Sequence, residues 1–185
     1  SNTRLIGKTV LQTNSWTHVA GTYNSSSGLF SVFINGAMDT SAIAAGAAPL
    51  TNPDSLFIGK GFNNPYNGQM DEVRIWNRVL SSDEIYRNSR LSLGTNSGVY
   101  SGLVLSVTFQ KNSGDGIVFT LNDQSGNSNH LFNRGVTESD LTNRPSQTID
   151  LNSSIELNGS NQYLASPDGS SFSPLFLHKA ILPIQ

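Results

Sequence analysis

The stretch that most constrains the fold is residues 68–86, in which Gly-Gln-Met-Asp-Glu-Val-Arg-Ile-Trp-Asn-Arg leads into Val-Leu-Ser-Ser-Asp-Glu-Ile-Tyr. Side chains along residues 71–76 alternate between two opposite faces, one of them largely apolar. This alternation predicts a half-buried β-strand. The alternation places Asp71 on the face that carries apolar residues. Glu72 is on the opposite face, where we expect it to be solvated or paired with a nearby arginine, Arg74 or Arg78.

A short helix is predicted directly after this strand. Ser81 is followed three residues later by Glu84, and this spacing forms a capping box, in which each side chain binds the backbone of the other. The helix is expected over about 82–89. A strand that ends in a capped turn of helix is therefore the predicted local structure.

Several other segments have the alternation, or the β-branched and aromatic content, that strands prefer. Asn35-Gly36 predicts a tight hairpin turn, because both central positions of a type I′ turn need a positive φ angle. Asn158-Gly159 predicts a second hairpin within residues 154–167. The predicted strands are residues 16–23, 29–34, 37–41, 55–59, 103–109 and 117–121. Such a pattern is typical of an all-β protein.

Three sets of residues carry a resemblance to a known family. Gly-x-Met-Asp-Glu-Val-Arg-Ile-Trp-Asn-Arg-x-Leu-Ser at 68–81 resembles the closing strand of laminin G-like, concanavalin A-like jelly rolls. Trp-Thr-His-Val-Ala and Val-Phe-Ile-Asn-Gly, at 16–20 and 32–36, resemble the same family. Blocks within 103–109, 123–127 and 155–164 resemble the opening part of its domain. The resemblance implies an antiparallel jelly-roll β-sandwich of concanavalin A-like type.

The order of these blocks is reversed relative to the family. Residues 1–90 resemble the second half of a laminin G-like domain, a glycine-containing linker follows at 91–101, and residues 102–175 resemble the first half. The chain is then either cut from a tandem array or folded as one circularly permuted sandwich. We favour one composite sandwich, because separate halves would expose core faces and unpaired strand edges. Halves that do not close on each other would dimerise or swap strands.

The tail, residues 176–185, matches no strand of the family that we can place. Two interpretations stay open for this segment. It is either an end of the chain that is foreign to the domain, or an edge strand that docks elsewhere.

A calcium site is the first candidate for chemistry. Calcium prefers six to eight oxygen ligands from carboxylates, amides and carbonyls. The loop 123–129 offers Asp123, Ser125, Asn127 and Asn129, and the opening and closing strands are neighbours in the family, which brings Asp71 close. The resemblance therefore implies one calcium ion at a sheet edge. The alternative is that Asp123 forms an Asx-turn and Asp71 accepts backbone hydrogen bonds.

Sugar binding is the second candidate. Exposed aromatic rings hold glycans in many lectin-like sandwiches, and the candidates for such stacking are Trp76, Tyr66, Phe62 and Tyr163. Packing in the core is favoured for Trp76, because this position is habitually aromatic in the family. The loop residues Asn63, Asn64, Tyr66 and Asn67 are the remaining ligand-binding candidates.

Composition narrows the classes of function. Only 13% of residues are charged and the net charge is -2, which gives no electrostatic reason to expect nucleic acid. No apolar run is long enough to span a membrane, and no secretory signal opens the sequence. Cysteine is absent. No Glu-x-Asp-x-Glu pattern of the kind found in related glycosidases occurs, and the three histidines are scattered.

We therefore expect a non-catalytic recognition module that binds carbohydrate or an extracellular protein, assisted by calcium. The resemblance implies a secreted or cell-surface location. The alternative is a structural spacer without a ligand of its own, and a glycoside hydrolase is less favoured. Fold alone does not decide between these classes.

Overall fold

The structure is a computed structural model that describes residues 5–43, 56–60, 65–90, 101–108, 120–134, 141–143, 153–166 and 176–181. The predictions for Phe62, Asn63, Asn64 and the linker up to residue 100 lie outside the described residues. The elements are β1 (His18–Asn24), β2 (Leu29–Ile34), β3 (Ala37–Ile43), β4 (Phe57–Ile58), β5 (Asn67–Met70), β6 (Val73–Trp76), α1 (Ser82–Asn88), β7 (Leu103–Val107), β8 (Thr120–Leu121), β9 (Leu131–Arg134), β10 (Leu141–Asn143), β11 (Ser153–Asn158), β12 (Tyr163–Ala165) and β13 (Phe176–Ile181).

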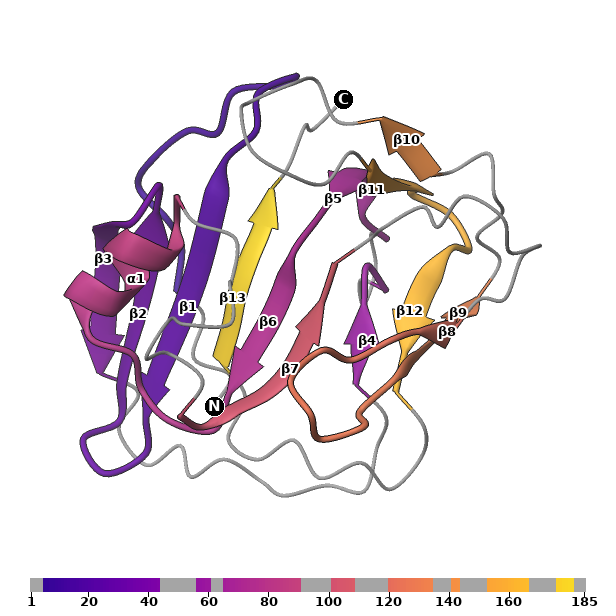
Figure 1. Cartoon of the computed structure of the whole chain (residues 1–185). Coiled ribbons are helices and arrows are strands. Elements are labelled where there is room, and N and C mark those ends of the chain that lie inside the picture. The colour runs from indigo at the N-terminus through magenta and orange to yellow at the C-terminus, as the bar shows by residue number, and fades with distance from the viewer. Residues whose placement is uncertain are drawn as a thin grey trace.

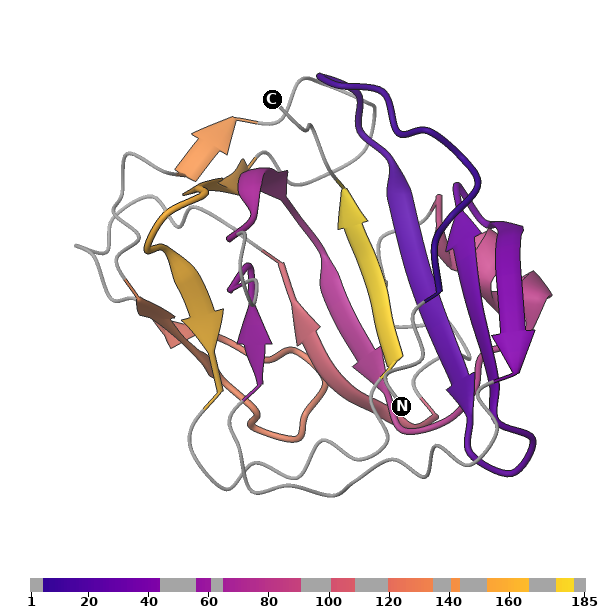
Figure 2. The ribbon, with the colours of Figure 1, turned by 180° about the vertical axis from the view of Figure 1, so that it is seen from behind.

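The described strands form three antiparallel sheets (Figure 1). The large sheet has the order β3-β2-β1-β13-β6-β7, and the smaller sheets have the orders β10-β11-β5 and β4-β12-β9-β8. Figure 2 shows from behind that β12 and β9 lie toward one side of the molecule and β1 to β3 toward the other, with β6 and β7 of the large sheet between them. The predicted all-β sandwich with one short helix is therefore confirmed.

The main hydrophobic core lies between the large sheet and the two smaller ones. Its buried members come from seven strands, which explains why short strands suffice: each contributes one or two side chains. They are Ile58, Met70, Val73, Ile75, Leu105, Val107, Leu131, Ile155, Leu157 and Leu164.

A second cluster packs around α1, on the part of the large sheet that holds β1 to β3 (Figure 1). Trp76 and Ile85 are fully buried there beside Phe33 and Leu103. The helix begins with the predicted capping box between Ser81 and Glu84. All four residues of β6 are buried, so both faces of the strand are covered and the prediction of a half-buried strand is wrong.

The stretch that was predicted to be one strand is divided into two. β5 pairs with β11 in one sheet, and β6 pairs with β7 and β13 in another. The break falls at Asp71 and Glu72, where Glu72 has a φ of 52°. A left-handed residue turns the backbone out of the strand direction. The chain thereby passes from one sheet to the next within two residues.

The Asn35-Gly36 hairpin is confirmed, since β2 pairs with β3 and both turn residues have positive φ. The Asn158-Gly159 hairpin is wrong, because β11 and β12 belong to different sheets. The Asn158 side chain accepts hydrogen bonds from the amides of Ser160 and Asn161. This Asx-turn leads the chain away from β11 instead of folding it back.

Residues 176–181 of the tail form the central strand β13, and the interpretation of the tail as an edge strand is wrong for these residues. β13 lies between β1 and β6 and is antiparallel to both. Phe176 and Leu177 are in register with β6, Ala180 and Ile181 are in register with β1, and His178 is in register with both strands. The two ends of β13 therefore pair with different neighbours. In this way one short strand joins two strands that are offset from each other.

Candidate functional site

The Asp123 loop is organised by one carboxylate. Asp123 Oδ1 accepts the backbone amides of Ser106 (2.9 Å) and Ser125 (2.8 Å). Its Oδ2 accepts the Ser125 hydroxyl (2.7 Å) and the Asn129 amide (3.0 Å). A carboxylate has about four lone-pair positions, and protein donors use all of them here. The carboxylate therefore holds the loop in an Asx-turn, as the structural alternative expected.

The two asparagines of this loop attach it to β7. The side-chain amide of Asn127 donates to the Leu103 carbonyl (2.8 Å), and that of Asn129 donates to the Val104 carbonyl (2.6 Å). Four of the predicted calcium ligands thus lie together beside one strand. Among the described residues, no group of three or more His, Asp or Glu side chains has the arrangement of a metal site. Calcium binding stays a prediction.

Asp71 lies at the break between β5 and β6. It is 2% exposed, and its Oδ1 accepts the backbone amide of Glu72 at 2.7 Å. Arg74 is the register partner of Ser106, whose amide donates to Asp123. The closing strand and the Asp123 loop are therefore neighbours in this chain through β7.

Glu72 and Arg74 form a buried ion pair. Their exposed fractions are 3% and 1%, so the expectation of solvation for Glu72 is wrong and the expectation of pairing with Arg74 is confirmed. Burial of two charges is costly unless they neutralise each other. The pair therefore ties the break at Glu72 to the strand that follows it.

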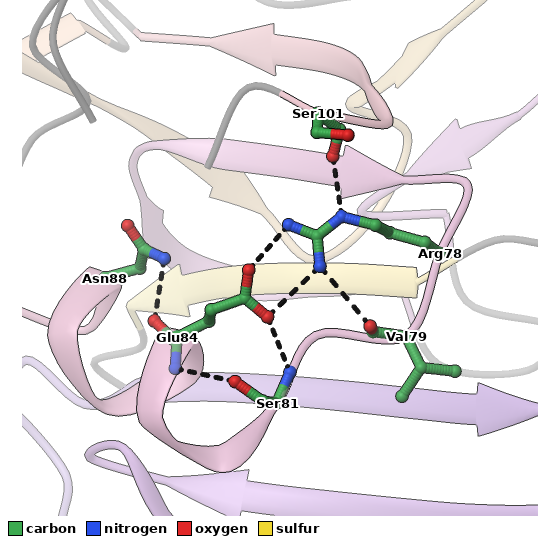
Figure 3. Close-up of polar contacts among 6 residues, drawn as sticks. All are labelled: Arg78, Val79, Ser81, Glu84, Asn88 and Ser101. Carbon is green, nitrogen blue, oxygen red and sulfur yellow. Dashed lines mark hydrogen bonds and ion pairs between the residues drawn. The ribbon is translucent and has the colours of Figure 1, made fainter. Parts of the chain in front are cut away.

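A partly exposed group of polar contacts holds the start of α1 (Figure 3). The Arg78 guanidinium donates to both carboxylate oxygens of Glu84 (2.6 and 3.1 Å), and its Nε donates to the Ser101 carbonyl (2.7 Å). Glu84 also accepts the Ser81 amide (2.8 Å). These hydrogen bonds, first that from Arg78, lower the pKa of Glu84 to about 2. Arg78 thus joins the helix to the segment that enters β7.

The remaining predicted ligand-binding residues have separate positions. Trp76 is fully buried, so its ring offers no face to a sugar. The Tyr66 hydroxyl donates to the Gln69 carbonyl at 3.0 Å, and burial raises the pKa of this phenol. Asn67 is exposed at the start of β5, opposite Asn158. The described candidates therefore do not form one site.

An exposed aromatic group lies on the four-stranded sheet. Ala165 is in register with Phe57 on one side and with Phe132 on the other, so the three residues share a sheet face. Phe57 and Phe132 are 43% and 44% exposed. Tyr163, two residues before Ala165, is on the same face, and its ring meets the Phe57 ring at 5.7 Å and 75°.

A cation completes this group. Lys60 Nζ lies 4.1 Å from the centre of the Phe57 ring and 4.8 Å from that of Tyr163. Such distances fit cation–π attraction. We call Phe57, Lys60, Phe132 and Tyr163 the aromatic face. Only Tyr163 among these four could be identified from the sequence, because pairing of strands that are distant in sequence brings the others to it.

Comparison with known proteins finds a family match for the first part of the chain. Residues 1–86 match the family model described as "Concanavalin A-like lectin/glucanases superfamily", of laminin G type. Residues 1–86 are therefore similar to laminin G-like domains. The resemblance of residues 102–175 to the opening half of such a domain stays a prediction.

A curated relative and a search of solved structures complete the comparison. Pentraxin-related protein PTX3 of Homo sapiens is 26% identical over 94 residues, which cover 44% of this chain and 25% of the relative. The chain thus aligns with about a quarter of that protein's length. No solved structure matches the chain. In the described residues, no helix is long and apolar enough to cross a membrane.

Proposed function

We propose that this laminin G-like chain is a non-catalytic recognition module that binds carbohydrate at the aromatic face. The observation that carries the proposal is the exposure of Phe57 and Phe132 on one sheet face, with Tyr163 and Lys60 beside Phe57. Exposed apolar groups rimmed by polar ones mark binding surfaces. The C–H face of a sugar ring packs on such rings, and its hydroxyls reach the polar rim.

The size of the aromatic face favours a saccharide over a protein. An aromatic side chain buries at most about 150–250 Å², and the rings of the aromatic face are less than half exposed. The available ring area is therefore on the order of 300 Å². A specific protein interface needs roughly 800 Å² on each partner. One or two sugar rings fit the smaller area.

Lys60 gives the aromatic face a polar anchor. Its ammonium lies near two ring faces, which limits its motion and leaves its outer side free for hydrogen bonds. Ligand sites commonly combine apolar walls with a few fixed polar groups. Lys60 therefore supplies directionality that rings alone lack.

Calcium enters the proposal as an assisting ion at Asp71 and the Asp123 loop. Its support is that four oxygen-bearing side chains gather beside β7. Binding there requires Asp123 to exchange protein donors for the ion, because both of its oxygens accept hydrogen bonds. We place the module in a secreted or cell-surface protein, following its similarity to pentraxin-related protein PTX3 and to the laminin G-like family.

A glycan array followed by calorimetry tests the proposal. Wild-type protein is expected to bind at least one glycan saturably, and Phe57→Ala and Phe132→Ala each to weaken binding at least about tenfold, or about 1.4 kcal/mol. Leu29→Ala is the matched control, since Leu29 is a similarly exposed apolar residue (38%) in the large sheet. Each measurement is repeated with calcium and with a chelator.

Three outcomes have distinct meanings. Binding that Phe57→Ala abolishes and Leu29→Ala spares supports the aromatic face. Binding that is equal in all variants moves the site elsewhere, and absence of binding to any glycan favours the structural spacer. Loss of binding in chelator, restored by calcium, supports the ion, and equal binding in both refutes its assistance.

A further inference from the structure

The two parts of the chain, residues 5–90 and 101–181, are joined by hydrogen bonds in all three sheets. We call them the leading half and the trailing half. β4, β5 and β6 of the leading half have no ladder within the described leading half. Their partners are β12 for β4, β11 for β5, and β7 and β13 for β6. Each sheet therefore contains strands of both halves.

The large sheet shows this interleaving most clearly (Figure 1). Along the order β1-β13-β6-β7, strands of the leading and trailing halves alternate. Without β13, the edges of β1 and β6 that face it would be open, and open edges readily accept another strand. The leading half alone therefore presents a strand-shaped gap between two defined edges.

The main core is divided between the halves in the same way. The leading half provides Ile58, Met70, Val73 and Ile75, and the trailing half provides Leu105, Val107, Leu131, Ile155, Leu157 and Leu164. Each of these side chains is at most 7% exposed. Separation of the halves would expose this apolar surface to water, which costs about 25 cal/mol per Å².

Three glycines mark points where the halves come unusually close. A Cβ at Gly59 would lie 2.3 Å from Leu157 Cδ1, and a Cβ at Gly159 would lie 2.6 Å from Asn67 Cβ. A Cβ at Gly102 would lie 2.6 Å from Asn77 Oδ1. All three glycines have positive φ. Close contacts at several separate points fix one relative arrangement of the two surfaces.

We propose that the two halves are complementary binding partners, so that the leading half of one copy accepts the trailing half of a second copy. None of these pairings depends on which chain supplies the strand, and exchange of identical elements costs little because the same contacts re-form. Residues 91–100, which join the halves, contribute effective concentration, in the millimolar range for short linkers. The closed single chain and the exchanged assembly are two connections of one interface.

The test separates the halves after folding of the full chain. A protease site is inserted between Asn96 and Ser97, the folded protein is cleaved, and its mass is measured by light scattering and native mass spectrometry. Cleaved wild-type protein is then mixed with a cleaved isotope-labelled copy. The expected result is one species that contains both halves, followed by the appearance of both mixed-mass pairs.

Cross-linking reports the register of the exchanged pairs. Because the chain has no cysteine, a disulfide can form only between introduced residues. Asn67→Cys in one cleaved copy and Asn158→Cys in the other occupy register partners across β5 and β11. They are expected to cross-link, and Asn67→Cys with Asn127→Cys is the control because these positions are not partners.

A matched pair of glycine variants tests the specificity of association. Gly159→Ala is expected to weaken association of the cleaved halves at least tenfold, because of its contact with Asn67. Gly126→Ala is the control, since Gly126 also has a positive φ but no atom lies near its added Cβ. Halves that separate on cleavage, that stay together without exchange over several days, or that cross-link equally at both cysteine pairs would overturn the proposal.

Discussion

The large sheet and the four-stranded sheet both join the halves, but they leave their side chains in different environments. All four residues of β6, including Arg74, are buried. In β4, by contrast, Ile58 is buried and Phe57 is 43% exposed. A strand that is covered on both faces has no side chain free for a ligand, and a strand at the outer side of a sandwich has every second one. The most recognisable stretch is therefore structural, and the less recognisable one is the better binding surface.

Replacement of Trp76 in β6 and of Phe57 in β4 tests this contrast most strongly. Trp76→Ala is expected to lower the free energy of unfolding by about 3–5 kcal/mol, because it empties a fully buried volume between α1 and β7. Phe57→Ala is expected to lower it by less than about 1 kcal/mol, because its ring is partly exposed. Urea unfolding followed by circular dichroism measures both.

The reverse pattern in glycan binding completes this test. Phe57→Ala is expected to lose binding while it stays folded, and Trp76→Ala to bind with unchanged affinity under conditions in which it is still folded. Similar stability losses in the two variants would show that the aromatic face is part of the core.

Substitution in the turn between β2 and β3 is expected to have a smaller effect on stability. Gly36 has a φ of 81°, and a Cβ there would lie 2.9 Å from the Tyr86 Cα of α1. Gly36→Ala is therefore expected to cost about 1–2 kcal/mol for the left-handed backbone and about 1–3 kcal/mol more for overpacking. The melting temperature, measured by calorimetry, should fall accordingly.

Gly126→Ala separates these two contributions. Its φ is 88° and no atom lies within 4 Å of the added Cβ, so only the backbone cost applies. An equal fall in melting temperature for both variants would mean that α1 does not lie against this turn in solution.

Local signals in the sequence were sufficient for features that a few neighbouring residues determine. The Asn35-Gly36 turn and the Ser81–Glu84 capping box follow from backbone sterics and short-range hydrogen bonds, and the structure contains both. The same local logic failed at Asn158-Gly159, where the Gln162 side chain accepts the Asn158 amide and the chain turns toward another sheet. A dipeptide reports that the chain turns, but not which strand it joins next.

Features that depend on distant residues could not be predicted in this way. The alternation in residues 71–76 does not reveal that Glu72 is left-handed, that the strand changes sheets there, or that both faces of β6 are buried. The tail lacks a recognisable motif, yet two open edges give β13 a central place. The aromatic face depends on Ala165 lying between Phe57 and Phe132, which are 75 positions apart in the sequence.

The ion pair at the start of α1 gives the smallest expected effect and tests a contact between the halves, since Arg78 binds both Glu84 and the Ser101 carbonyl. The hydrogen bond from Arg78 lowers the pKa of Glu84 from 4.5 to about 2. A carboxylate whose pKa is lowered by folding stabilises the fold above its unfolded pKa, and this contribution is lost as the pH falls through the folded value. Relative to Glu84→Gln, wild-type protein should therefore be more stable above about pH 4.5, and the difference should vanish near pH 2. Because the pair is partly exposed, the difference should stay below about 1 kcal/mol.

Urea unfolding between pH 2 and 6 measures this difference in stability. In a second variant, Arg78→Ala, the pKa of Glu84, followed by NMR, should return toward 4.5. An unchanged pKa in that variant would assign the shift to the capping box alone and leave Arg78 without an energetic role at this junction.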